Sequence, residues 1–238
     1  MNNSNFLGIA RPHGLYLGLL VWLAVSVLAG CTMSPKTYFY SLQGFNGQTV
    51  VAKAQLDASK AYGVGPVFLP EPLLQPGVVS HVGGQQLDVS LYSVWAGNLQ
   101  DAVTRVLAAN IAELGQVDAV WPFPWDNRSR PTRQIRIVFE QFSGAIGGAV
   151  VLKAKWALTE NNGETVLLQK REHLTKTAAG NDYGHYVEAL NLLINELSAN
   201  IVADLARLDA AGVQALPVTS MSLSDSNQDE VPANALVF

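Results

Sequence analysis

The side chains that could perform chemistry are few and lie far apart along the chain. Four histidines, His13, His81, His173 and His185, lack the helical spacing of a metal-binding pair. The sequence also has no Gly-x-Ser-x-Gly elbow, no P-loop, and a single cysteine, which excludes an intrachain disulfide and a multi-cysteine metal site. We therefore predict no catalytic residues, no metal site and no enzymatic activity. A hydrolase with an unrecognised site is retained as an alternative hypothesis.

The lone cysteine, Cys31, follows an apolar segment near the N-terminus. Residues 15–29 carry no charge, and the segment is shorter than the roughly 20 residues that span a membrane. It ends in Leu28-Ala29-Gly30-Cys31, which resembles the lipobox of bacterial lipoproteins. The resemblance implies signal cleavage after Gly30, diacylglycerol on the Cys31 thiol and an N-acyl chain, typically palmitate, on its new amino group. The alternative is an uncleaved membrane anchor with a buried thiol.

The residues after Cys31 bear on where the protein resides. The next two residues are Thr32 and Met33. Neither is the Asp that would resemble the inner-membrane retention signal of enterobacterial lipoproteins. The implied destination is the outer membrane, on its periplasmic face. Because each buried methylene contributes about 0.8 kcal/mol, an anchor of several acyl chains is permanent. Only residues 32–37 separate the lipid from the first predicted strand, a reach of about 20 Å. We expect the folded body to stay near the membrane, so that partners must come to it.

The composition is that of a folded, nearly neutral protein. Of the 238 residues 49% are hydrophobic and 14% charged, and the formal net charge is −4. This composition excludes a disordered chain, and a nucleic-acid-binding domain would be clearly basic. We divide the chain into a signal peptide (1–30), a lipidated tether (31–37), a folded domain (38–208) and a flexible acidic tail (209–238).

Tryptophan and arginine residues are concentrated between positions 121 and 136. Both residue types are over-represented at the energetic centres of protein interfaces. We predict five of them as contacts with a partner or with lipid headgroups: Trp121, Trp125, Arg128, Arg130 and Arg133. The alternative is that the arginines are solvated beside Asp126 and Glu140.

Hydrophobic periodicity predicts the elements that position these residues. Strands are predicted at 38–42, 62–69, 78–82, 86–90, 117–121, 135–140, 150–159 and 165–177, with hairpin turns at Gly83-Gly84 and Asn161-Asn162-Gly163. One helix is predicted from an Asn98 cap to Gly115, and another over 183–208 with Asn181 or Asp182 as its cap. These elements predict an α+β fold, a mainly antiparallel sheet with both helices packed on one face.

Several short motifs, taken in their order along the chain, resemble one family. They are Gly63-Val-Gly-Pro-Val67 with Leu69-Pro-Glu71, Val94-Trp95 before the first helix, Phe142-x-Gly144, and the tyrosine-led last helix. Over about residues 38–208 they resemble the PqiC-type (YmbA-like) lipoproteins, which are auxiliary lipoproteins of ABC-type transport systems built around MCE-domain proteins. The order of the motifs, rather than any one of them, carries the resemblance.

This resemblance implies a non-catalytic subunit under the outer membrane that binds the periplasmic tube of an MCE protein. It also implies a homo-oligomeric ring, which would form a collar around the end of the tube. The transported molecule would be lipid or another apolar compound. The alternative is a periplasmic carrier that binds lipid in its own cleft, between the long helix and the sheet. No cofactor is expected other than the covalent lipid on Cys31.

Overall fold

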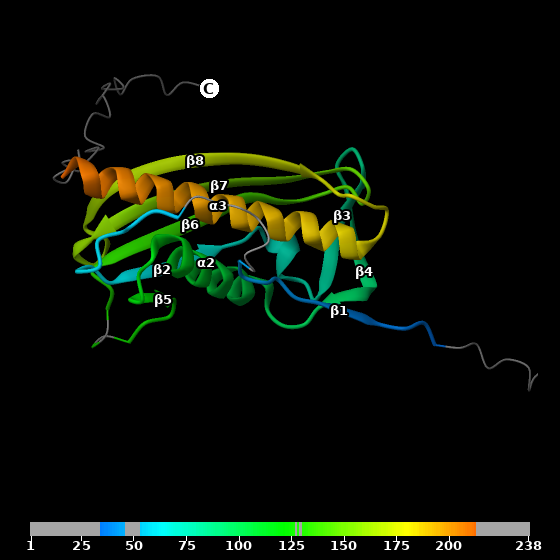
Figure 1. The fold of residues 1–238 in the computed structure, drawn as a ribbon. Helices are drawn as coiled ribbons and strands as arrows, with labels where there is room; N and C mark the ends of the chain where they lie inside the picture. The colour runs from blue at the N-terminus through cyan, green and yellow to red at the C-terminus, as the bar shows by residue number, and fades with distance from the viewer. Residues whose placement is uncertain (1–33, 46–52, 127, 129, 213–238) are drawn as a thin grey trace, which may run out of the picture. The chain divides into compact units, whose positions relative to one another are not determined.

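Two sheets and two long helices form the body of the chain within the residues that the structure describes (Figure 1). The computed structural model describes residues 34–45, 53–126, 128 and 130–212. Residues 1–36 and 37–238 are two separate units, and the elements described below belong to the second. Gly30, Cys31 and the rest of the predicted signal peptide lie outside the described residues, as does the chain from residue 213 onward.

The smaller sheet has three strands in the order β1-β4-β3. Gly77–Gly83 (β3) and Gln86–Trp95 (β4) form an antiparallel hairpin around the predicted turn, where Gly83 and Gly84 both have positive φ. Tyr38–Tyr40 (β1) pairs in parallel with the end of β4. β4 continues past its predicted end at Ser90. Its pairing with β3 is irregular there, between Val79 opposite Val89 and Gly77 opposite Val94, and the Ser90 hydroxyl accepts hydrogen bonds from the backbone amides of Tyr92 and Ser93.

The larger sheet has five strands in the order β5-β2-β6-β7-β8. In this order the strands are Val120–Pro122, Tyr62–Phe68, Arg133–Gly144, Ala149–Glu160 and Thr165–Thr177. β6, β7 and β8 form the predicted antiparallel meander, and the 3-10 turn η2 (Asn161–Gly163) joins the last two. β2 is parallel to both of its neighbours.

The parallel pairs are the main addition to the predicted topology. Between β2 and β5 the chain passes through α2 (Leu99–Gly115), and a helical crossover returns the chain to the end of the sheet from which it started. β5 therefore runs parallel to β2, and β6 then joins the opposite side of β2 in the same direction. Antiparallel pairing holds for the meander and the β3–β4 hairpin, and the α+β class is confirmed.

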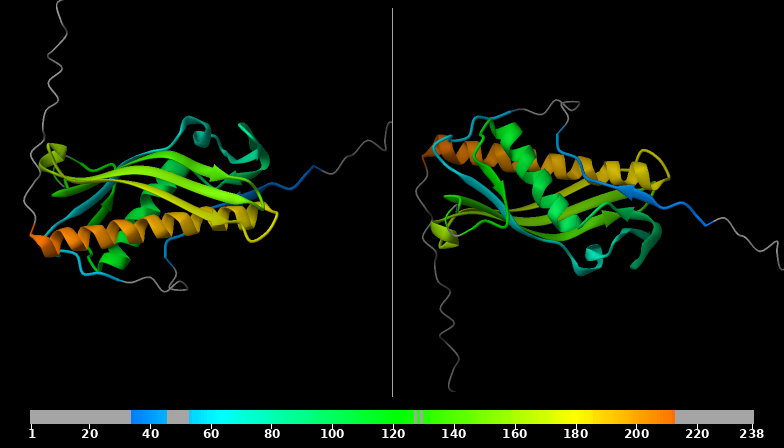
Figure 2. Two further views of the ribbon diagram at one scale, coloured as in Figure 1. Left: turned by 90° about the horizontal axis from the view of Figure 1, so that it is seen from above. Right: turned by 90° about the horizontal axis from the view of Figure 1, so that it is seen from below.

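Both helices cover the same face of the larger sheet, as predicted, and they also contact each other (Figure 2). Asn98 caps α2 by accepting a hydrogen bond from the Asp101 amide at 3.0 Å. Of the two residues considered for the cap of α3 (Tyr183–Ala211), Asp182 accepts the hydrogen bond, from the His185 amide. α3 ends at Ala211, past its predicted end at residue 208, and is followed by Gly212, which has positive φ.

The hydrophobic core fills the space between the helices and the larger sheet. Alternate residues of β7 point inward and are buried: Val150, Leu152, Ala154, Trp156 and Leu158. The stripe of α3 that faces them is also completely buried: Leu193, Ile194, Leu197, Ile201 and Leu205. The long helix is therefore a packed component of the core, because its apolar face meets the sheet directly.

Candidate functional site

The predicted contact residues lie on and beside the loop that joins β5 to β6. Because these strands flank β2 on opposite sides, the loop that joins them must cross β2. We call this loop, residues 123–132, the crossing loop. It crosses at Gly63, where an added Cβ would lie 2.4 Å from Trp125 Cζ2 and 2.3 Å from Pro131 Cγ. Trp125 and Pro131 therefore pack directly on the backbone of β2, an approach that requires glycine.

Aromatic side chains hold this loop and are partly exposed. The rings of Phe123 and Trp125 meet edge to face with centroids 5.2 Å apart, and the Trp125 indole N–H donates to the Trp121 carbonyl at 3.2 Å. The Phe123 amide donates to the Val64 carbonyl at 2.8 Å, which ties the start of the loop to β2. Trp121 is 41% exposed and Phe123 45% exposed, whereas Trp125 is half-buried. We call Trp121, Phe123 and Trp125 the aromatic cluster.

An open pocket of about 270 Å³ lies beside the aromatic cluster. Its lining combines aromatic, amide and cationic side chains: Pro66, Phe123, Trp125, Arg130, Gln134, Arg136 and Asn162. Arg128 is exposed on the same loop. The structure thus places four of the five predicted contacts, Trp121, Trp125, Arg128 and Arg130, on or next to one surface loop.

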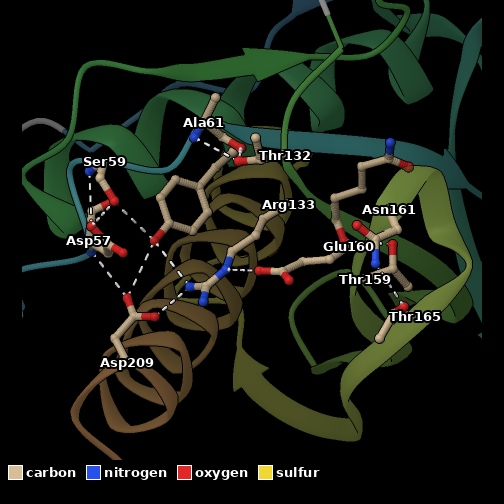
Figure 3. Close-up of polar contacts among 12 residues, drawn as sticks. Asp57, Ser59, Ala61, Thr132, Arg133, Thr159, Glu160, Asn161, Thr165 and Asp209 are labelled. Atoms are coloured by element: carbon tan, nitrogen blue, oxygen red, sulfur yellow. Dashed lines mark hydrogen bonds and ion pairs between the residues drawn. The ribbon is translucent and has the colours of Figure 1, made fainter. Parts of the chain in front are cut away.

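The fifth predicted contact, Arg133, is not on this surface. It is the first residue of β6 and only 9% exposed, and its side chain enters a polar cluster (Figure 3). Arg133 Nε donates to Glu160 Oε1 at 2.8 Å, and Arg133 Nη1 donates to the carboxylate of Asp209. We therefore correct the prediction for this residue, because a buried guanidinium held by two carboxylates does not face a partner.

The polar cluster of Tyr62, Arg133, Glu160 and Asp209 joins four elements: β2, β6, β7 and α3. Burial raises the pKa of Tyr62 to about 12, and the Asp209 carboxylate adds to the effect, so this phenol is neutral near pH 7. Burial by itself would lower the pKa of Arg133. The hydrogen bonds to Asp209 and Glu160 have the opposite and larger effect, so the pKa of Arg133 lies above its usual value. Arg133 directly follows the crossing loop, so the cluster anchors the end of that loop.

Asp209 is the member of the polar cluster that sequence reasoning missed. It lies in the last turn of α3, whereas the predicted domain boundaries placed it at the start of the tail. The apolar periodicity of the helix ends near Leu208, which led to the shorter prediction. A better signal was available in Gly212, because glycine commonly follows the last turn of a helix. The backbone amide of Asp57 also donates to the Asp209 carboxylate, at 3.1 Å.

The histidines within the described residues lie in different places. His81 Nε2 is 2.9 Å from Ser143 Oγ, His173 is exposed on β8, and His185 Nδ1 is 2.7 Å from Asp182 at the start of α3. Among the described residues no three His, Cys, Asp or Glu side chains are grouped so as to hold a metal ion. None of the helices in the described part of the chain is both long and apolar enough to cross a membrane.

Comparison with known proteins places the body of the chain in context. Residues 40–202 match a family described as the ABC-type transport auxiliary lipoprotein component. No curated protein sequence is significantly similar to the chain. An uncharacterised protein of known structure is 22% identical with a TM-score of 0.58, and the match covers 72% of this chain and 99% of that one. Protein XCC0632 from Xanthomonas campestris is 12% identical with a TM-score of 0.61, covering 74% of this chain and 98% of its own. At these identities the two structures show a shared fold.

Proposed function

The chain belongs to the family of ABC-type transport auxiliary lipoprotein components, and on this premise we propose that it is a non-catalytic docking subunit of an MCE-type intermembrane lipid transport system. In this proposal Cys31 carries the lipid after cleavage behind Gly30, and the body lies under the outer membrane on its periplasmic side. The periplasmic tube of the MCE protein binds to the body there, and several copies form a ring around the end of the tube.

The family match carries this proposal. It begins within β1 and ends within α3, so it spans both sheets and α2. The resemblance to the family therefore concerns the whole folded body rather than one motif. The short tether is consistent with it, because about 20 Å of extended chain keeps a lipidated body against its own membrane. A body held in this way acts as a fixed receptor for a partner that arrives from the other membrane.

Packing supports docking over the alternative of lipid carriage. A carrier would need an apolar cavity of several hundred Å³ between the long helix and the sheet. The residues that meet there, including Trp156, Leu197 and Ile201, are at most 1% exposed, so protein side chains already fill this space. The hollows found between other elements are open grooves, such as one of about 640 Å³ beside the β3–β4 hairpin.

We assign the partner contact to the crossing loop and its aromatic cluster. Tryptophan at the centre of an interface commonly contributes much of the binding energy, and Trp121 and Phe123 expose large rings here. Arg128 and Arg130 on the same loop would add electrostatic selectivity for an acidic partner surface. Gly63 and the polar cluster hold the loop from beneath, so the contact surface is built on a rigid base.

Co-purification tests this proposal. The full-length lipoprotein, carrying an affinity tag, is recovered from detergent-solubilised envelopes, and co-purified proteins are identified by mass spectrometry. We expect an MCE-domain protein with the wild type, and at least about tenfold less of it with Trp121→Ser/Phe123→Ser. Leu192→Ser is the matched control, because Leu192 is an exposed apolar residue on α3, outside the loop.

Two results would contradict the proposal. One is a wild-type protein that recovers no MCE-domain protein and has the mass of a monomer in light scattering. The other is phospholipid retained in stoichiometric amount by the natively purified protein, which would favour the carrier. Recovery of the partner by the double variant at the wild-type level would instead reject the crossing loop as the contact.

A further inference from the structure

The β3–β4 hairpin exposes apolar side chains on both of its faces. Successive residues of a strand point to opposite faces, and one face is ordinarily buried. In β4, however, residues 86–92 are all exposed or half-buried. Leu91 is 79% exposed, and Phe39 in the adjacent strand β1 is 71% exposed. We call the following residues the hairpin patch: Phe39, Val82, Leu87, Val89, Leu91 and Tyr92.

The hairpin has almost no charged side chains, whose hydration would otherwise favour its exposure to water. From Gly77 to Trp95 the ionisable side chains, apart from Tyr92, are His81 and Asp88. Both contact the rest of the body: His81 is bonded to Ser143, and Asp88 accepts a hydrogen bond from the Tyr183 hydroxyl at 3.2 Å. Soluble proteins rarely gather this many exposed apolar side chains on one element without a partner, and edge strands in water usually carry lysine.

The chain reaches this sheet directly from the proposed lipid anchor. β1 is parallel to β4, with Tyr38 opposite Ser93, so the first residue of β1 lies one residue past the exposed run 86–92 of β4. Residues 32–37 provide at most about 20 Å of chain between Cys31 and Tyr38. If Cys31 is lipidated, the membrane surface must lie within about this distance of Tyr38, which lies near the Leu91 and Tyr92 part of the hairpin patch.

We propose that the hairpin patch enters the bilayer interface as a second, non-covalent membrane contact. The hairpin patch would contact the boundary between phospholipid headgroups and acyl chains. Aromatic rings favour this depth, and the transfer of leucine and valine side chains from water to it is favourable. The inference rests on the lipid anchor of the proposed function. It adds an orientation, because a tether alone lets the body rotate, whereas two contacts fix it.

This orientation would direct the crossing loop away from the membrane. Figure 1 shows the β3–β4 hairpin at one end of the body and β5, which precedes the crossing loop, at the other end. With the hairpin patch in the bilayer interface, the aromatic cluster faces the periplasm, where a partner from the opposite membrane arrives. The hairpin and the loop thus divide membrane contact and partner contact between the two ends of the body.

A probe of membrane depth tests the inference. Cys31 is the only cysteine and is blocked by lipid in the mature protein, so Leu91→Cys offers a single thiol for a nitrobenzoxadiazole fluorophore. Because Leu91 is largely exposed, this substitution leaves the core intact. Trp121→Cys is the matched control, since Trp121 is an exposed residue of β5, the strand that Figure 1 shows at the opposite end of the body from the hairpin. The lipidated proteins are incorporated into vesicles of phosphatidylethanolamine and phosphatidylglycerol, and quenching by spin-labelled phospholipid is measured.

We expect quenching of the Leu91 probe to be at least about twofold stronger than quenching of the Trp121 probe. Equal quenching in protein that floats with the vesicles would overturn the hairpin contact and leave the proposed function intact. Blue-shifted emission at position 91 without quenching would also overturn it, and would identify a second copy of the chain as the occupant. Failure of the protein to float would refute the lipid anchor, and with it both the inference and the proposed function.

Discussion

Arg133, the first residue of β6, donates a hydrogen bond to Asp209, 76 residues later in the last turn of α3. The pair connects the end of the long helix to the strand that follows the crossing loop. Their side chains are only 11% and 14% exposed, and Glu160 and Tyr62 complete the surroundings. A charge buried to this extent depends on its partners, so the pair affects the stability of both elements.

Removal of the arginine should destabilise the protein strongly. We expect Arg133→Met to lower the free energy of unfolding by about 3 kcal/mol, because it leaves two carboxylates without their counter-charge. Urea denaturation followed by circular dichroism measures the change. Lys53→Met is the control, since Lys53 pairs with Glu113 on the surface and its loss should cost below about 1 kcal/mol. Equal losses in the two variants would show that the polar cluster has no special role.

Because the crossing loop packs on Gly63, a larger residue at this position should clash with the loop. Gly63→Ala places a methyl group against Trp125 and Pro131, and we expect a loss of about 1–3 kcal/mol together with a change in tryptophan fluorescence. Gly97→Ala serves as the control, because nothing lies within 4 Å of an added Cβ there. A Gly63→Ala protein as stable as the Gly97→Ala protein would mean that the loop does not press on β2.

Alkaline pH should weaken the fold through its buried tyrosines. Burial raises the pKa of Tyr186 to about 12, and its hydroxyl donates to the Val79 carbonyl at 2.8 Å and accepts from the Gly144 amide at 3.0 Å. Above pH 10 the unfolded chain loses this proton first, so the contribution is complete below about pH 10 and is lost as pH rises towards 12. Tyr62 acts in the same direction.

The measurement is urea denaturation at about pH 9 and about pH 11, where each such tyrosine contributes a slope of up to about 1.4 kcal/mol per pH unit. We expect Tyr186→Phe to be less stable than the wild type at the lower pH, because two hydrogen bonds are lost. Its stability should then fall less steeply towards the higher pH. A variant with the same slope as the wild type would show that Tyr186 does not titrate in this range.

The lipid anchor predicts a processing defect. Cys31→Ser removes the thiol that would receive diacylglycerol in the proposed function, so we expect an unprocessed precursor held in the inner membrane by residues 15–29. Intact-mass spectrometry and membrane fractionation detect this change. Thr32→Ser, one residue further on, keeps the cysteine and should be processed normally. A Cys31→Ser protein that still fractionates with the outer membrane without its leader would exclude lipidation as the anchor.

Most individual elements could be predicted from the sequence because their signals are local. The Asn98 cap, the Gly83-Gly84 turn and the alternating residues of β7 each depend on neighbours within a few positions. The α+β class and the placement of both helices on one face followed from the order of these elements. The family resemblance, carried by short motifs in order, is confirmed by the match over residues 40–202.

Local patterns were thus enough to predict most of the elements, the fold class and the family. They did not predict that β2 lies between two parallel strands, that the crossing loop packs on Gly63, or that Arg133 is buried against Asp209. These features depend on contacts between residues that are far apart along the chain. Strand direction depends on where a crossover returns the chain, and the exposure of an arginine depends on which remote carboxylates the fold brings to it.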